Sequence, residues 1–178
     1  MSVETVNPKT REELLRDLMV ARDAVSDLVR GLSLAQFTGG SASQWSVSHH
    51  LDHLCRSNAP VAAGMSVPER LPQAPGARPS RTFASLQADY QARLSEGVKA
   101  TGRFVPEPGG DLADQLAEYQ GGLEVLVERV QAWPETDLDV LAMPHPALGL
   151  LTVREMLYFT LAHNLHHLRG MQARLEHP

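Results

Sequence analysis

The chain has 178 residues and a formal net charge of −5; 43% of its residues are hydrophobic and 21% are charged. This length suits one domain, residues 1–178, with a single sizeable core, and the composition is that of an ordinary globular protein. The acidic balance and the absence of any basic run argue against nucleic acid as a partner.

The sequence also gives expectations about location. The segment from Met1 to Pro8 lacks the basic and apolar regions of a secretory signal, and no apolar stretch is long enough to span a bilayer. Cys55 is the only cysteine, so no intrachain disulfide can form, and a reducing compartment fits. We therefore expect a cytoplasmic protein with no membrane partner.

A first helix is expected after Thr10. The run Thr10-Arg11-Glu12-Glu13 is a capping box, in which the Thr10 hydroxyl and the Glu13 carboxylate each satisfy a backbone N–H group at the helix start. Gly31 is a suitable C-terminal stop. Apolar residues recur between these ends at helical spacing: Leu14, Leu18, Ala21, Val25 and Leu28.

A second helix is expected from Val47, with Ser46 as its cap, after a polar segment from Ser33 to Gln44. Pro60 lies inside this helical pattern and has no backbone N–H to donate. We therefore predict a kink or an interruption between Arg56 and Pro60. The apolar stripe of this helix consists of Val47, Leu51, Leu54, Val61, Ala62 and Met65.

The segment from Val67 to Ser80 is expected to be an extended connector, because it holds four prolines. A linker between two domains is the alternative, but neither flank is large enough to bury a good core alone. We interpret it as a crossover within one domain. The prolines are Pro68, Pro72, Pro75 and Pro79, and a short third helix is then predicted by Phe83, Leu86, Tyr90, Leu94 and Val98.

Two further long helices are expected, from Asp111 to Trp133 and from Leu151 to Leu175, the latter with Thr152 as a possible cap. The residues from Pro134 to Gly149 are expected to form a loop. No segment shows strand-like alternation with hairpin signals. The predicted fold class is therefore all-α, a four-helix bundle with one additional short helix.

Histidines on the last helix suggest a cation site. His163 and His167 are four residues apart, so they share one face, roughly 6 Å apart between Cβ atoms. Two imidazoles so placed can bind one ion, but histidines that pack and hydrogen-bond to neighbours are an equal alternative for this helix alone. On the second helix, ~100° per residue places His50 and His53 beside the apolar stripe. Periodicity does not choose between those two.

Three motifs, in this order between Trp45 and Gln172, make the chain resemble the DinB/YfiT-like metal-binding four-helix bundles. In one branch of that family a His-Pro-x-x-Gly turn precedes the last helix. The matching residues are Trp45-Ser46 followed by His53, the turn His145-Pro146-Ala147-Leu148-Gly149, and the pair His163 and His167.

The resemblance implies that His53, His163 and His167 bind one divalent ion, with water or substrate completing the coordination. Three protein ligands with an open position are typical of catalytic sites, and nickel, zinc or ferrous iron all accept three imidazoles. His50 and Asn164 are then expected to contact the ligands from outside the coordination shell, although Asn164 could instead make a helix-to-helix hydrogen bond. His145 is expected in a turn, His166 at the surface and Cys55 as an inert thiol.

The function implied by this resemblance is that of a metal-dependent enzyme acting on small molecules. Members of the similar family include transferases and isomerases that use low-molecular-weight thiols, so a thiol activated at the metal would attack an electrophilic substrate. A metal-water hydrolase, which needs no thiol, is one alternative. A non-catalytic metal-binding or stress-associated module is another. A homodimer is also expected from the resemblance.

Overall fold

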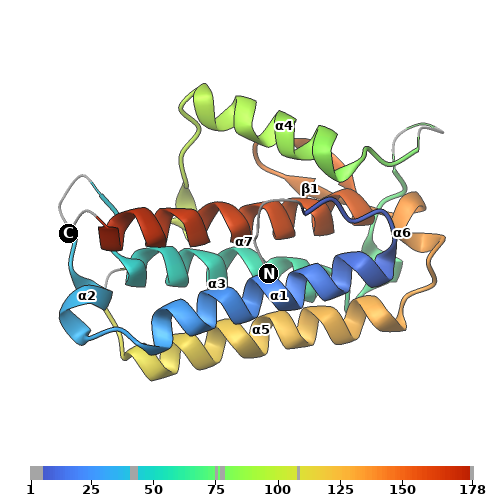
Figure 1. The fold of residues 1–178 in the computed structure, drawn as a ribbon. Helices are drawn as coiled ribbons and strands as arrows, with labels where there is room; N and C mark the ends of the chain where they lie inside the picture. Colours follow the sequence, from blue (N-terminus) through green and yellow to red (C-terminus); the bar gives the residue numbers. More distant parts are fainter. Residues whose placement is uncertain (1–5, 41–43, 75, 77–78, 108, 177–178) are drawn as a thin grey trace.

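The computed structural model describes residues 6–40, 44–74, 76, 79–107 and 109–176, and most of these residues are in helices (Figure 1). The longer helices are α1 (Arg11–Arg30), α3 (Val47–Gly64), α4 (Phe83–Ser95), α5 (Leu112–Ala132) and α7 (Val153–Glu176). The shorter elements are α2 (Leu34–Thr38), η2 (Pro68–Arg70), η3 (Gly102–Phe104), α6 (Asp137–Val140), β1 (Ala142–His145) and β2 (Gly149–Thr152).

The helices α1, α3, α5 and α7 run side by side as a four-helix bundle, and α4 lies outside it over α7 (Figure 1). Helix α3 packs against both α5 and α7, and α1 packs against the same two helices. The core between them is made of fully buried side chains such as Leu18, Leu51, Leu126 and Leu161. The expected all-α fold class, with one additional short helix beside four long ones, is confirmed.

The starts of α1 and α5 are set by capping side chains, of which the sequence indicates the box at Thr10. Thr10 accepts a hydrogen bond from the Glu13 backbone N–H and Glu13 accepts one from the Thr10 backbone, which completes the capping box of α1. The Asp111 side chain caps α5 by accepting hydrogen bonds from the backbone N–H groups of Ala113 and Asp114. Trp133 then ends α5, and its indole Nε1–H donates to the Met65 carbonyl.

Helix α3 continues through Pro60, so of the two outcomes expected from the sequence, a kink or an interruption, the interruption does not occur. A proline inside a helix removes the hydrogen bond that its own nitrogen would donate. Pro60 lies only four residues before the end of α3 at Gly64, so little of the helix lies beyond it.

Helix α4 ends earlier than the apolar spacing predicts. Its last residue is Ser95, and Val98 is 43% exposed instead of packed on the stripe. Gly97 has φ +84°, a left-handed conformation that turns the chain away from the helix. The prediction missed this stop because it followed the apolar spacing past a glycine.

The expected loop before α7 contains a small antiparallel hairpin, which sequence analysis did not predict. Strands β1 and β2 have four residues each, with Ala142 opposite Thr152 and His145 opposite Gly149. Four residues are too few to give a recognisable alternation. At the turn, His145 Nδ1 accepts hydrogen bonds from the backbone of Ala147 and Leu148, and Gly149 adopts φ +75°.

The proline-rich connector packs against this hairpin. The Ala142 N–H donates to the Pro72 carbonyl and the Ala74 N–H donates to the Val140 carbonyl. Apart from the single turn η2, the connector is non-helical in its described residues, as its prolines predict; Pro75 lies outside those residues. The connector therefore returns to the bundle as an intradomain crossover would.

Helix α7 begins at Val153, two residues later than predicted, because Leu151 and Thr152 belong to β2. Thr152 and Glu155 cap its start reciprocally: the Glu155 N–H donates to Thr152 Oγ1 and the Thr152 N–H donates to the Glu155 carboxylate. The fully buried Glu155 carboxylate also accepts from the Arg81 guanidinium, 3.1 Å away. These contacts among Arg81, Thr152 and Glu155, called the clasp below, connect the segment before α4 to the start of α7.

Among the described residues, no helix is both long and apolar enough to cross a membrane.

Candidate metal centre

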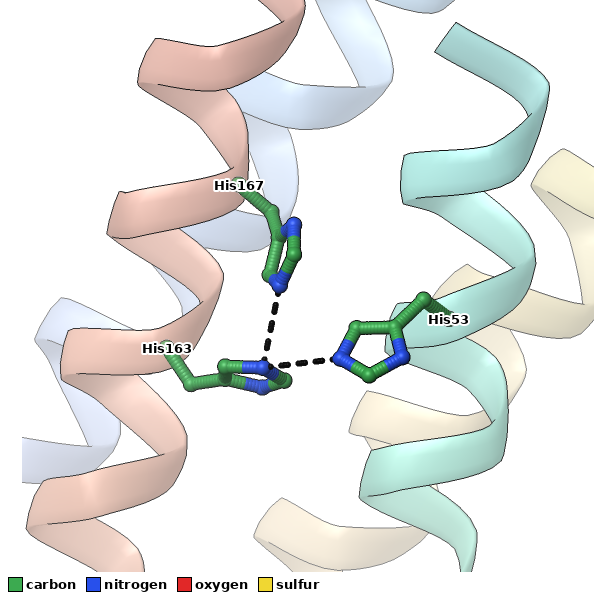
Figure 2. A group of neighbouring side chains, drawn as sticks. All are labelled: His53, His163 and His167. Atoms are coloured by element: carbon green, nitrogen blue, oxygen red, sulfur yellow. Dashed lines mark hydrogen bonds between the residues drawn. The ribbon is translucent and has the colours of Figure 1, made fainter. Parts of the chain in front are cut away.

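Three histidines from two packed helices, α3 and α7, meet between these helices (Figure 2). His53 points out from α3, while His163 and His167 project from successive turns of α7 toward it. The four-residue spacing on α7 stacks the last two side chains on one face. All three are buried, with 5–6% of their surface exposed.

The convergence is made by the same atom of each ring, Nε2. His163 Nε2 lies 3.1 Å from His53 Nε2 and 3.0 Å from His167 Nε2. Two imidazole nitrogens bound tetrahedrally at about 2.0–2.1 Å to one zinc ion lie about 3.3–3.4 Å apart. These two pairs of nitrogens need to separate by only a few tenths of an ångström to accept an ion, and all three ligand atoms lie within 4.8 Å of one another.

Without an ion, the three Nε2 atoms cannot all be satisfied by hydrogen bonds to one another. His53 Nδ1 lies 2.6 Å from the Phe104 carbonyl, which only accepts, so Nδ1 carries the hydrogen and Nε2 presents a lone pair. In the neutral rings, a single hydrogen on His163 Nε2 would have to serve two acceptors, or two lone pairs would face each other. One cation satisfies all three nitrogens at once, so the donor set fits a metal ion.

Burial keeps these imidazoles neutral, which is the state that binds metals. The pKa of His53 is lowered by desolvation, and the pKa values of His163 and His167 are lowered well below the usual histidine value for the same reason. The neighbouring histidines add to the effect at His163 and His167 because a second positive charge in the cluster would be repelled. No proton has to be removed from the cluster at neutral pH before an ion binds.

The outer nitrogens of the three rings have different surroundings. His53 Nδ1–H donates to the Phe104 carbonyl of η3, and His167 Nδ1 lies 2.8 Å from His50 Nδ1. His163 Nδ1 is buried and has no hydrogen-bond partner among the described residues. Hydrogen bonds of this kind, made by the ring nitrogen that does not face the ion, fix the tautomer and the orientation of a ligand histidine. His53 and His167 have such contacts.

His50 occupies its place because the facing residue of α7 is a glycine. A Cβ atom at Gly170 would lie 2.7 Å from His50 Cε1, closer than side chains approach each other. The resulting gap lets the half-buried His50 ring reach His167 with Nδ1 and leaves it out of the Nε2 cluster. The structure thus places His53 among the convergent nitrogens and His50 behind one of them, a choice that periodicity leaves open.

Among the described residues, Asn164 makes no hydrogen bond to a ligand histidine. Its amide exchanges hydrogen bonds with Asn58 of α3, and its Oδ1 also accepts from the Tyr119 hydroxyl of α5 at 3.0 Å. The step of about 100° from His163 turns Asn164 into the core between these helices. Of the two roles expected from the sequence, the structure therefore gives it the helix-to-helix hydrogen bond.

The remaining histidines and the cysteine lie outside the cluster. His49 Nδ1 takes part in the cap of α3 at Ser46, and His145 is in the hairpin with its ring 4.2 Å from the ring of Phe159. His166, expected at the surface, is half-buried there, because its ring packs beside Tyr90 of α4. Cys55 is buried, and burial raises the pKa of its thiol to about 12, so it is unreactive.

Aromatic rings surround the candidate ligands. Trp45 stacks on His167 with a ring-centroid distance of 5.7 Å and lies 5.0 Å from the His53 ring. Phe159 stacks on His163 at 5.0 Å, and Tyr90 meets the same ring edge-on at 6.0 Å. These rings line the cluster with apolar surface, which limits water around it and strengthens electrostatic interactions within it.

Sequence reasoning missed two of these contributors. The Phe104 carbonyl belongs to the backbone, so its role leaves no trace in residue type. Gly170 did carry a signal, since an isolated glycine inside a helical pattern often marks a close approach. Trp45 was noted only as part of a motif, and the structure adds its packing against His53 and His167.

Fold and site together define a class of protein: a four-helix bundle whose adjacent helices present three buried histidines positioned to hold a metal ion. Comparison with protein-family models matches residues 20–171 to the DinB superfamily. This match covers most of the chain, including α3 and α7, and the chain belongs to the DinB superfamily. No curated protein matched the sequence.

Proposed function

We propose that this protein binds one divalent transition-metal ion through His53, His163 and His167, and that it is a metal-dependent enzyme acting on small molecules. The observation that carries the proposal is the convergence of three buried, neutral Nε2 atoms that hydrogen bonds alone satisfy poorly. Nickel, zinc and ferrous iron all accept such a donor set.

A divalent ion held by three neutral imidazoles acts as a Lewis acid and lowers the pKa of a water or thiol bound beside it. The chain itself supplies orientation and a dry surrounding. The Phe104 carbonyl holds the His53 ring in one tautomer, and His50 contacts the outer nitrogen of His167. Trp45 and Phe159 stack on ligand rings and restrict their motion.

The reaction class that we propose is a thiol-dependent transfer or isomerisation, in a cytoplasmic homodimer. Three protein ligands leave coordination positions for a low-molecular-weight thiol or a substrate, which supports an active rather than a closed site. The family resemblance supports the thiol. Sedimentation at the 19.5 kDa mass of one chain alone would contradict the dimer.

The first test is the metal content of protein purified without chelators or metal-affinity resin. We expect about one nickel, zinc or iron ion per chain, and its loss in His163→Ala, because three ligands are needed for a tight site. His166→Ala is the matched control: it removes a neighbouring imidazole on α7 that does not join the cluster. Equal metal in all three proteins, or none after reconstitution, would refute the site.

The second test addresses the chemistry. The metal-loaded protein is incubated with electrophilic small molecules, with and without thiols such as glutathione, and both the conversion of the electrophile and the loss of free thiol are measured. Conversion that requires both thiol and metal, and that is absent in His163→Ala, is the expected result; loss of thiol then indicates transfer, and unchanged thiol indicates isomerisation. Product formation without any thiol would instead indicate a hydrolase, and no turnover with a loaded site would indicate a binding module.

A further inference from the structure

Ser57 places a hydroxyl group beside the candidate ligands. It follows His53 by one turn on α3 and is half-buried, and its Oγ lies 3.5 Å from His53 Nε2. That nitrogen is the one that faces His163, so the hydroxyl is next to the point where the three ligand atoms converge. A distance of 3.5 Å is long for a hydrogen bond to nitrogen, so the contact itself is weak.

The orientation of Ser57 differs from that of most hydroxyls on the helices of this protein. Serine and threonine in helices commonly donate to the carbonyl four residues earlier. Ser26, Thr38, Ser95 and Thr160 do so at 2.7–3.0 Å, as does Ser66 just after the end of α3, whereas Ser48 near the start of α3 donates to Gly109 and Gln115. The Ser57 hydroxyl instead faces the side chain of His53, four residues earlier. It has no other hydrogen-bond partner among the described residues.

Several other polar groups around the ligands are already engaged. The Phe104 carbonyl accepts from His53, His50 is in contact with His167, and Asn164 bonds to Asn58 and Tyr119. The nearby rings are those of Trp45 and Phe159, which stack on the ligands, and of His166, 5.1 Å from the ring of His167. A small polar ligand at the ion would have the Ser57 hydroxyl beside it, because Ser57 Oγ lies 3.5 Å from His53 Nε2.

We propose that Ser57 is a ligand-binding residue whose hydroxyl hydrogen-bonds to the small anionic or protic molecule that occupies the open position of the metal centre. This inference rests on the proposed function, because it requires an ion at the three histidines. A hydroxyl suits the task because it both donates and accepts, so it serves an anion such as a thiolate as well as a neutral thiol or water.

The test uses cobalt(II) as the metal and azide as the probe. Apo protein is loaded with cobalt, and azide is titrated while the visible absorption of the ion is followed. We expect Ser57→Ala to bind cobalt as tightly as wild type but azide about tenfold more weakly, the usual effect of losing a hydrogen bond to a charged group. Ser57→Thr, which keeps the hydroxyl, should restore most of the azide affinity.

Ser66→Ala is the matched control, since the Ser66 hydroxyl lies near the end of the same helix and donates to the Ala62 carbonyl. It should bind azide like wild type. Equal azide affinity in Ser57→Ala and wild type would overturn the inference while leaving the metal site intact. Loss of cobalt binding in Ser57→Ala, with the far-ultraviolet circular dichroism unchanged, would overturn it by showing a metal ligand instead. Failure of wild type to bind cobalt would overturn the proposed function as well.

Discussion

At the scale of single residues, the three candidate ligands are held unequally. His53 is oriented by a rigid backbone carbonyl, His167 by the side chain of His50, and His163 by stacking on Phe159. A backbone acceptor cannot be removed by substitution, whereas a side-chain partner can. His50 is therefore the residue at which support for a ligand can be separated from ligation itself.

We predict that His50→Ala weakens metal binding by about 10–100-fold without abolishing it, the usual effect of removing an outer contact of a ligand histidine. His53→Ala should abolish tight binding, because it removes a donor atom. Competition titration with a chromophoric chelator measures both affinities. If His50→Ala abolished binding and His53→Ala did not, the ligand assignment on α3 would be wrong.

Gly170 offers an independent check on the same contact. Gly170→Ala leaves every histidine in place but puts a Cβ atom 2.7 Å from His50 Cε1. The ring of His50 must then move away from His167, so metal affinity should fall in the same direction as in His50→Ala. Gly121→Ala is the control, because a Cβ there meets no atom within 4 Å.

At the scale of elements, the start of α7 determines where His163 and His167 lie. Thr152 and Glu155 cap the helix, and the Glu155 carboxylate also binds the Arg81 side chain and backbone. Removing the cationic partner of a buried carboxylate strongly destabilises the folded protein, because the negative charge is left uncompensated. The clasp therefore contributes to stability even though it is far from the site along α7.

We predict that Arg81→Leu lowers the free energy of unfolding by about 2–3 kcal/mol, somewhat less than for a fully buried pair because the Arg81 side chain is 27% exposed. Arg93→Leu breaks the exposed pair with Glu96 and should cost no more than about 1 kcal/mol. Urea unfolding monitored by circular dichroism gives both values. Equal losses in the two variants would argue against the clasp.

The same elements show how far the sequence predicts the fold. Apolar spacing located α1, α3, α5 and α7, with caps recognised at the starts of α1, α3 and α7. Helices α1, α3 and α5 each bury a stripe along several turns, whereas α7 is buried on every side from Val153 to Leu165. The hairpin was missed because four-residue strands carry no period, and the end of α4 was misplaced because Gly97 stops the helix before Val98. For the candidate metal site, the four-residue spacing identified His163 and His167 on α7. It left His50 and His53 as equal candidates for the ligand on α3.

That last ambiguity has a physical cause. His50 and His53 both flank the apolar stripe of α3, and which of them reaches the convergence point depends on how α3 is placed along α7. The Asn58 and Asn164 amides bond these two helices together in the core, and Gly170 admits the His50 ring. Such contacts join residues 106 or more positions apart, so no local pattern encodes them.

At the scale of the whole molecule, the candidate site exists only in the folded bundle. His53 and His163 are 110 positions apart and belong to different helices, so the unfolded chain does not present the three nitrogens together. An ion that binds the native state alone stabilises it by mass action. Metal binding and the packing of α3 against α7 are therefore coupled.

We predict that a divalent ion at a free concentration of 100 times its Kd raises the free energy of unfolding by about 2.7 kcal/mol. For a chain of this length, that corresponds to an increase in Tm of about 5–10 °C. Calorimetry of the apo and metal-loaded protein measures the shift, which should disappear in His163→Ala because one donor of the cluster is lost. His166→Ala should keep the full shift, since its ring lies outside the cluster. A shift of equal size in His163→Ala would mean that the ion stabilises the protein from another place.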